Sequence, residues 1–353
     1  MIAPIVLGAV LLAADAQAQA QAVEKVLIGA EPELHRCWER AAADDYRVEG
    51  QMALTVTVGA SGKVDKVLVK ADSTGRKGLE DCVKRVFDGV TFQDGAFDRG
   101  DSVEVPVTFK AETNITLRAG DAKSYKLNGA QGVAKVLVDE KTAKAEKASM
   151  VWVDLQPGAR FVRPSPKGAA FIFVRRGNAS FGGQTATEDD VVVLPDGSAP
   201  LILAGNRTEL VMVFVPPGAE QAYRTGAKIP EATAGGPAPK IVKMNAAERH
   251  DILGGKGSVA LYLQGGDAAV DKIRFGPGAA VAEHVHDGSA ELLYVVSGTG
   301  ELVVDGDKYP IQPFTAVYVP PNTKHSFTAG DSQVDAIQFY TPAGPEQRFK
   351  GTK

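Results

Sequence analysis

The chain has 353 residues, of which 44% are hydrophobic and 23% are charged, and its formal net charge at pH 7 is −4. This is the composition of an ordinary globular protein, and the length exceeds one typical core, so we expect two or three domains. The slightly acidic balance provides no basic surface, so nucleic acid is excluded as an expected partner.

The amino terminus is an uncharged apolar run over residues 2–14, followed by Ala and Gln repeats that offer small-residue cleavage sites. The run is too short to span a membrane and is typical of a secretory signal peptide, which we place at residues 1–22. No Lys or Arg precedes the run, so an upstream start, a weak signal or a short anchor also stays open. We expect a periplasmic or secreted protein of the cell envelope, without a stable membrane span.

Residues 23–112 have the pattern of a small α+β domain. Apolar residues at helical spacing predict one helix at residues 32–43 and another at residues 79–87. Alternating apolar and polar residues predict strands, and a turn at residues 60–62 would join the first two. The expected strands are at residues 52–58, 64–70 and 103–109.

The two cysteines of the chain, Cys37 and Cys82, fall one on each predicted helix. If they pair, they fit an oxidising compartment. Closing the loop between them would stabilise the fold by about 4 kcal/mol in the chain-entropy model. Two buried free thiols remain the alternative, and neither cysteine lies near the candidate site described below.

The order helix, hairpin, helix, strand resembles the C-terminal domain of TonB-type energy transducers and related envelope motility proteins. The resemblance implies a domain for protein contacts, so we expect an envelope protein partner through this region and no force-transducing role. The residues that carry it are Cys37-Trp38-Glu39, Gly50-Gln51-Met52, Gly62-Lys63-Val64, Cys82-Val83 and Val105-Pro106-Val107-Thr108-Phe109.

The rest of the chain contains an internal repeat. KSYKLN at residues 123–128 recurs as KIVKMN at 240–245, and DLQPG at 154–158 recurs as RFGPG at 274–278. Both copies are rich in short β-branched segments separated by Gly and Pro, which is typical of β-sandwiches and β-barrels. We therefore expect two β-barrels, at residues 120–226 and 240–350, joined by a Pro- and Gly-rich linker at 227–239.

The second copy carries the candidate site. His284 and His286 are two residues apart, so their rings would face the same side of a strand. A turn at residues 287–288 would then bring Glu291 back on a returning strand opposite them. Three imidazoles and one carboxylate are typical ligands of a first-row divalent metal. The candidate ligand set is His284, His286, Glu291 and His325, which uses three of the five histidines of the chain.

The spacing from Gly278 through the histidines and Glu291 to Gly298 resembles the first motif of the cupin superfamily, with every position filled. The second motif keeps its proline and its histidine at the right distance but departs at turn positions. Asn322 replaces a glycine, Phe314 stands at another glycine position, and Ala329 sits near the usual asparagine. Asn tolerates the left-handed backbone that such turns require.

The cupin resemblance implies a mainly β fold, with the small TonB-like α+β domain followed by two double-stranded β-helix barrels of the RmlC-like jelly-roll type, which is a bicupin. It implies a divalent metal (Fe, Mn, Ni, Cu or Zn) held by His284, His286, Glu291 and His325. Because many cupins have lost their metal, a metal-free barrel remains the alternative.

The first copy lacks these ligands. Aligning Gly158 with Gly278 places Ala170 or Phe171 at the position of Glu291 and prolines at the three histidine positions, namely Pro164, Pro166 and Pro200. No such side chain binds a divalent cation, so we expect a metal-free barrel with a structural role.

A ligand cavity without metal also remains open for the first copy. Arg160 and Arg163 lie close to the missing site and would line such a cavity, although arginines on loops are usually exposed and solvated.

Two function classes follow from the second copy. Four protein ligands leave open positions on an octahedral metal, which suits a dioxygenase, isomerase or lyase acting on a small oxygenated molecule, with Glu291 as ligand and catalytic proton carrier. The alternative is a non-catalytic envelope protein that binds a sugar or peptide in the barrel. Strand alternation suggests Tyr294, Tyr318, Phe327 and Gln338 as cavity-lining residues, with Gln338 bonded to a ligand, to a metal-bound water or to backbone.

Overall fold

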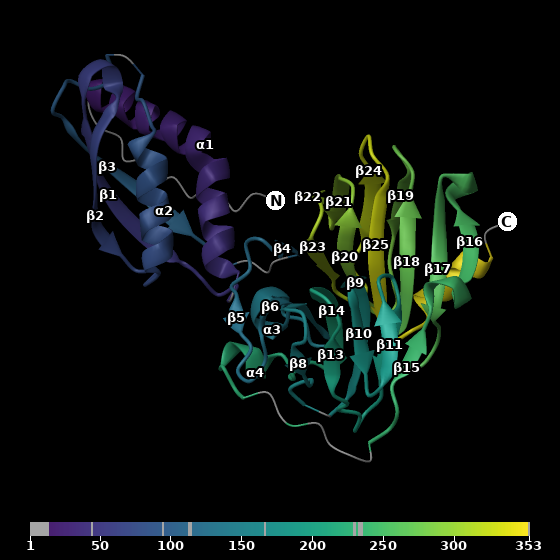
Figure 1. Cartoon of the computed structure of the whole chain (residues 1–353). Helices are drawn as coiled ribbons and strands as arrows, with labels where there is room; N and C mark the ends of the chain where they lie inside the picture. The colour runs from purple at the N-terminus through teal and green to yellow at the C-terminus, as the bar shows by residue number, and fades with distance from the viewer. Residues whose placement is uncertain are drawn as a thin grey trace. The chain divides into compact units, whose positions relative to one another are not determined.

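The computed structural model describes residues 14–43, 45–93, 95–111, 115–165, 167–228, 231 and 236–351. It separates into two compact units, residues 1–113 and 114–353 (Figure 1). Most of the signal peptide predicted at residues 1–22 lies outside the described residues. Among the described residues, no helix combines the length and the apolar character needed to cross a membrane.

The first unit packs two helices on one face of a three-stranded antiparallel sheet of order β2-β1-β3 (Figure 1). The sheet buries one alternating set of side chains, as Met52, Leu54, Val56 and Val58 illustrate in the first strand. The order of elements is the one expected from the sequence, with bounds α1 Ala14–Ala42, β1 Gly50–Val58, η1 Ala60–Gly62, β2 Val64–Asp72, α2 Lys77–Asp88 and β3 Ser102–Phe109.

The start of the first helix differs from the prediction. We expected it at residue 32, where the apolar residues at helical spacing begin, but α1 begins at Ala14 and Pro32 lies inside it. The preceding residues are good helix formers, and Leu27 and Ala30 are buried in the core of the unit. Burial on both sides of Pro32 therefore outweighs the lost backbone hydrogen bond.

The two cysteines form a disulfide, which confirms the pairing that the sequence left open. The bond joins Cys37 on α1 to Cys82 on α2, with their Cα atoms 5.7 Å apart. It links the two helices that cover the sheet. The core residues of the unit either lie in the chain segment between the two cysteines or pack against it.

The second unit contains two barrels, each made of a seven-stranded and a four-stranded sheet. The first barrel has sheet orders β15-β12-β9-β14-β7-β6-β5 and β11-β10-β13-β8, and the second has β4-β23-β20-β25-β18-β17-β16 and β22-β21-β24-β19. The two orders correspond strand for strand, and the DLQPG and RFGPG segments end the corresponding strands β7 and β18, as the sequence repeat predicts. The match of residues 123–128 with residues 240–245 was wrong, because β5 corresponds to β16 and β15 corresponds to β4.

The strand bounds in and around the first barrel are β5 Tyr125–Lys126, β6 Gly132–Val138, β7 Ser149–Leu155, β8 Arg160–Phe161, β9 Ala169–Arg176, β10 Asn178–Phe181, β11 Gln184–Thr187, β12 Val191–Leu194, β13 Ile202–Ala204 and β14 Thr208–Val215, with short helices α3 Glu140–Ala143 and α4 Gln221–Arg224. Those of the second are β16 Glu248–Ile252, β17 Gly257–Leu263, β18 Ala269–Phe275, β19 Ala280–His284, β20 Ala290–Ser297, β21 Gly300–Val304, β22 Asp307–Ile311, β23 Thr315–Val319, β24 His325–Ala329 and β25 Val334–Thr341. Short 3-10 turns lie at η2 Met244–Ala246, η3 Leu253–Gly255 and η4 Pro345–Lys350.

Each barrel lends one edge strand to the other. β4 (Thr116–Arg118) precedes the first barrel in the chain but pairs with β23 of the second, and β15 (Lys240–Val242) precedes the second barrel but pairs with β12 of the first. The exchange covers the edges that β12 and β23 would otherwise leave open.

The two motif strands do not form the expected hairpin. β19 pairs with β24 in the four-stranded sheet, whereas β20 pairs with β25 and β23 in the seven-stranded sheet. His284 ends β19, and His286 lies beyond the strand end. The turn near Gly288 (φ 69°) therefore carries the chain from one sheet of the barrel to the other.

Candidate metal centre

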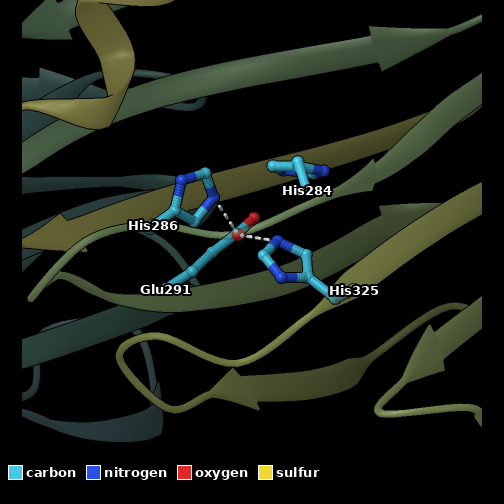
Figure 2. Close-up of side chains that lie close together, drawn as sticks. All are labelled: His284, His286, Glu291 and His325. Carbon is cyan, nitrogen blue, oxygen red and sulfur yellow. Dashed lines mark hydrogen bonds and ion pairs between the residues drawn. The ribbon is translucent and has the colours of Figure 1, made fainter.

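The four candidate ligands come together inside the second barrel (Figure 2). Their ligand atoms all lie within 4.8 Å of one another. The ring centroids of the three histidines are 4.2–4.9 Å apart. His286, Glu291 and His325 are buried and His284 is half-buried, so the ligand set forms one wall of an interior site.

Backbone carbonyls orient two of the rings. His284 Nδ1 lies 2.9 Å from the carbonyl oxygen of Ala282, and His325 Nδ1 lies 2.9 Å from that of Thr323. An Nδ1–H that donates to a carbonyl leaves Nε2 deprotonated, as a metal ligand must be. Among the described residues, neither buried Nε2 atom has an aligned hydrogen-bond partner, although that of His325 lies 3.0 Å from Oε2 of Glu291. Two such nitrogens beside a carboxylate are a donor set that a divalent cation would satisfy.

Glu291 is the centre of the cluster. Its Oε2 lies 3.0 Å from Nε2 of His286 and 3.0 Å from Nε2 of His325, the second contact being within ion-pair distance without hydrogen-bond alignment. Its Oε1 accepts a hydrogen bond from Nε2 of Gln338. Burial alone would raise the pKa of Glu291, but the two histidines outweigh it and hold that pKa well below its usual range.

The pKa values of His284 and His325 shift in opposite directions. Burial, which disfavours the charged ring, lowers the pKa of His284 to about 4. Burial acts in the same direction on His325, but the Glu291 carboxylate outweighs it and raises the pKa of that ring. His284 is thus neutral at neutral pH and ready to ligate, whereas a cation bound at Glu291 would offset the carboxylate charge that favours the protonated form of His325.

The ligands open onto a cavity of about 360 Å³. This volume is in the range of small-molecule sites. Its wall is mostly apolar, formed by Ile252, Leu253, Ile273, Phe275, Val281, Ala282, Leu293, Val295, Leu302, Ile311, Val317, Phe327, Val334, Ala336 and Phe349. The remaining lining residues are Glu283, His284, Glu291, His325, Gln338 and Arg348. A small apolar molecule would therefore lie directly against the ligand set.

Strand alternation was right for two of its four candidate lining residues. Phe327 and Gln338 line the cavity as expected, but Tyr294 and Tyr318 are absent from its lining and alternate with the residues that do line it. In β20 the inward residues share the parity of Glu291, so position 294 faces away. Gln338 bonds a metal ligand, Glu291, which was not among the partners that we expected for it.

Two ionisable groups near the ligands escaped the sequence analysis. Asp271 on β18 is fully buried, and neither carboxyl oxygen has a hydrogen-bond partner among the described residues. Burial raises its pKa well above the usual value, and the charge of Glu291 adds to this effect. Arg348 on η4 lies 3.4 Å from Nε2 of His286 through Nη1 and donates to the Tyr340 hydroxyl at 3.0 Å.

Structural comparison of the two barrels distinguishes both groups. Strand registers and the matching cis prolines, Pro216 and Pro342, fix the correspondence between the copies. Seven polar residues in and around the ligand cluster of the second barrel have apolar counterparts in the first. The pairs are His284 with Pro164, Glu291 with Ala170, His325 with Pro200, Asp271 with Val151, Gln338 with Met212, Tyr340 with Phe214 and Arg348 with Ala222.

The strand register also decides which residue of the first barrel stands at the position of Glu291. Ala170 pairs with Phe214 as Glu291 pairs with Tyr340, so Ala170, and not Phe171, replaces the glutamate. Pro166 lies outside the described residues. Phe161, Phe181 and Phe214 are buried in a continuous apolar core. In the part of the first barrel that the structure describes, no side chain at a ligand position can bind a cation.

We expected Arg160 and Arg163 to be exposed to solvent, and only Arg160 is. Arg160 is exposed, but Arg163 is fully buried and donates to the carbonyl oxygens of Gly168 and Pro195. Arg163 thus ties together the turns at the closed end of the first barrel, where the second barrel has its ligands.

Comparison with known proteins agrees with this architecture. Residues 272–340 match the family model described as the Cupin domain. The chain is 31% identical over 71 residues to "Polyketide synthase CurC" of Streptomyces cyaneus, covering 20% of this chain and 46% of that protein. It is 29% identical over 70 residues to "Protein SchB" of Streptomyces halstedii, covering 20% of this chain and 51% of that protein. The chain thus spans about half the length of the curated relatives it matches.

Solved structures resemble both barrels together. An oxalate decarboxylase of Bacillus subtilis, described for its Mn(II) centres, matches with a TM-score of 0.50 at 17% identity over 67% of this chain and 79% of its own. The formate complex of the Lactobacillus farciminis oxalate decarboxylase matches with a TM-score of 0.52 at 16% identity over 67% and 88%. At this identity the likeness shows the fold, which is that of a bicupin.

Proposed function

We propose that this chain, which contains a cupin domain and folds as a bicupin with a divalent-metal site in its second barrel, is a metal-dependent enzyme. Its substrate would be a small, largely apolar molecule with oxygen functions, and the reaction would be of the dioxygenase, isomerase or lyase type. The observation that carries the proposal is the apolar cavity of about 360 Å³ that ends on the His284, His286, Glu291 and His325 cluster.

The wall of the cavity argues for the substrate class. Oxalate is small and doubly charged, and burying it against apolar side chains without matching donors would be costly. An oxygenated molecule with a hydrocarbon body fits this wall better. One relative is named a polyketide synthase, and polyketides are molecules of this kind.

A divalent metal held by the four ligands would supply Lewis-acid or oxygen-binding chemistry at its open positions. The chain itself supplies orientation and a proton site. The Ala282 and Thr323 carbonyls fix two rings, and Gln338 fixes the rotation of the Glu291 carboxylate. We assign Glu291 as the catalytic proton carrier, because it touches both the ligand cluster and the cavity.

Metal content tests the proposal first. Elemental mass spectrometry should find about one equivalent of Fe, Mn, Ni, Cu or Zn in the purified protein. The His284→Ala/His286→Ala variant should lose it, and the His325→Ala variant should lose it too. Pro164→Ala, at the matching position of the first barrel, is the control and should leave the metal content unchanged. A protein that takes up no metal even after reconstitution would contradict the enzyme proposal.

Export and a partner for the first unit belong to a second candidate function, a non-catalytic envelope protein that binds a sugar or peptide. The Cys37–Cys82 disulfide favours an oxidising compartment such as the periplasm. The first unit, similar in element order to TonB-type C-terminal domains, would contact an envelope protein. Glu291→Gln separates the two functions, because an enzyme loses turnover while retaining substrate binding, whereas a binding protein has no turnover to lose.

A further inference from the structure

Arg348 is a cation at the opening of an apolar cavity. It lines the cavity, and its side chain is also exposed, so it stands where the cavity meets solvent. It belongs to η4, which follows the last barrel strand. Its Cζ lies 4.8 Å from the centroid of the Phe349 ring and 5.8 Å from that of Tyr340, so two aromatic rings fix the guanidinium in place.

The guanidinium has no carboxylate partner. Its polar contacts are the Tyr340 hydroxyl at 3.0 Å and the two nitrogens of the His286 ring at 3.4 and 3.5 Å. Among the described residues no Asp or Glu forms an ion pair with Arg348. A guanidinium has five N–H donors in a planar fork that matches a carboxylate. At least two of the five donors therefore have no partner among the described residues.

The charges around the cavity add up in favour of an anion. Glu291 is the buried carboxylate of the lining and would be offset by the divalent cation that it ligates. Glu283, the other acidic lining residue, is exposed and lies 3.9 Å from Nζ of Lys324. Arg348 therefore leaves the mouth of the cavity, beside the ligands, with an excess of positive charge.

The fold does not require an arginine at this position. Ala222 occupies the corresponding place in the first barrel, where Glu220 accepts from the backbone of Gly218 as Glu346 accepts from Gly344. The neighbouring aromatic positions, Tyr223 and Phe349, are buried in both copies. The arginine thus occurs in the barrel that has the metal ligands and not in the one that lacks them.

We propose that Arg348 binds an anionic oxygen group of the substrate, in the first instance a carboxylate, while the apolar body of the same molecule fills the cavity. The inference rests on the proposed function and specifies its substrate class as an apolar monocarboxylate or an equivalent oxyanion. Arg348 would fix the distance between the charged group and the carbon atoms that lie against the metal ligands.

Isothermal titration calorimetry of the metal-containing protein tests this inference with pairs of probes that differ in charge alone. Suitable pairs are benzoate with benzamide, phenylacetate with phenylacetamide, and cinnamate with cinnamamide. For at least one pair the carboxylate should bind about tenfold tighter than the amide or better, since a charge-assisted bidentate contact is among the strongest hydrogen bonds. No preference in any pair would overturn the inference.

Variants decide whether Arg348 is the source of the preference. Arg348→Met keeps the apolar stem and should remove the preference, and Arg348→Lys should retain part of it. Lys350→Ala removes an equal charge from the same short helix and is the matched control, which should keep the preference whole. Metal content is measured for every variant. A preference that survives in Arg348→Met would assign the carboxylate to the metal alone and overturn the inference.

The proposed function fails in a different way. Carboxylate preference in a protein that takes up no metal even after reconstitution would contradict the enzyme proposal and support the binding role of Arg348. Turnover of neutral molecules without carboxylate preference would support the enzyme and overturn the role of Arg348.

Discussion

Asp271 is an acidic residue that lies fully buried inside the second barrel. It is cross-strand partner to Gln338, and both side chains face inward. Within the described part of the chain, the Gln338 amide oxygen and both Asp271 carboxyl oxygens lack hydrogen-bond partners. Because burial raises the pKa of Asp271, its protonated form has an O–H to give to that amide oxygen. The acid would then hold Gln338 with its amide nitrogen toward Glu291, as a positioning residue.

The raised pKa of Asp271 has a defined effect on stability. The folded protein binds a proton that the unfolded chain releases above about pH 4, so this residue lowers stability as pH rises from there through its folded pKa. Asp271→Asn removes the titration and keeps a donor. In chelator-treated protein it should raise the free energy of unfolding at pH 7 by about 1–3 kcal/mol and change it little at pH 4.

Urea unfolding at the two pH values measures this difference. Asp251→Asn, at an exposed position of the same barrel, is the control and should alter neither value. An Asp271→Asn protein that is less stable than the parent at pH 7 would show that the carboxyl is ionised and paired in solution.

At the scale of elements, both barrels have a glycine directly after the same strand, β20 in the second barrel and β9 in the first. Gly298 follows β20 with φ 84°, and Gly177 follows β9 with φ 82°. A Cβ atom on Gly298 would lie 2.2 Å from the carbonyl oxygen of Gln333, and one on Gly177 would lie 2.4 Å from that of Arg207. The metal-free barrel needs this glycine as much as the other does, so the last glycine of the cupin-like motif serves the fold.

Gly298→Ala should therefore destabilise the protein by about 3 kcal/mol or more, because a left-handed backbone and a backbone clash add. Gly278→Ala is the matched comparison. It has φ 64° but no heavy atom within 4 Å of its Cβ position, so it should cost only about 1 kcal/mol. Chemical denaturation measures both. Equal losses would mean that the close approach at Gly298 relaxes without cost.

At the scale of the whole second unit, the exchanged strands tie the barrels into one structure. β4 completes the large sheet of the second barrel, and β15 completes that of the first. Both strands are short. β4 precedes the first barrel in the chain but pairs in the second, and β15 precedes the second barrel but pairs in the first. Neither barrel therefore has a complete sheet made from its own continuous segment. We expect the two barrels to unfold together.

Leu117, in β4, is buried with 6% of its surface exposed. Leu117→Ala should lower the free energy of unfolding by about 2 kcal/mol and leave one joint transition for the two barrels. Leu203→Ala, at an exposed strand position, is the control and should change it by less than about 0.5 kcal/mol. Calorimetry of the full chain that resolves separate transitions, with only one of them shifted by Leu117→Ala, would contradict joint unfolding.

The sequence by itself determined the features that depend on local pattern. Strand alternation, helical spacing and turn residues predicted the elements of the first unit to within a few residues, except where burial extended α1 through Pro32. Asn322 was expected to take a left-handed backbone, and its φ is 62°. The repeat predicted two barrels, and the spacing of His284, His286, Glu291 and His325 predicted which one gathers a ligand set.

Tertiary structure decided what depends on contacts between distant strands. Sequence spacing cannot show that β19 and β20 lie in different sheets, that Cys37 bonds Cys82, or that the barrels exchange edge strands. Nor can it place Asp271 and Arg348 beside Glu291, because an acid in a strand and an arginine in a terminal turn are usually exposed. Only closure of the barrel brings those charges within reach of the ligands, in a wall that is otherwise apolar.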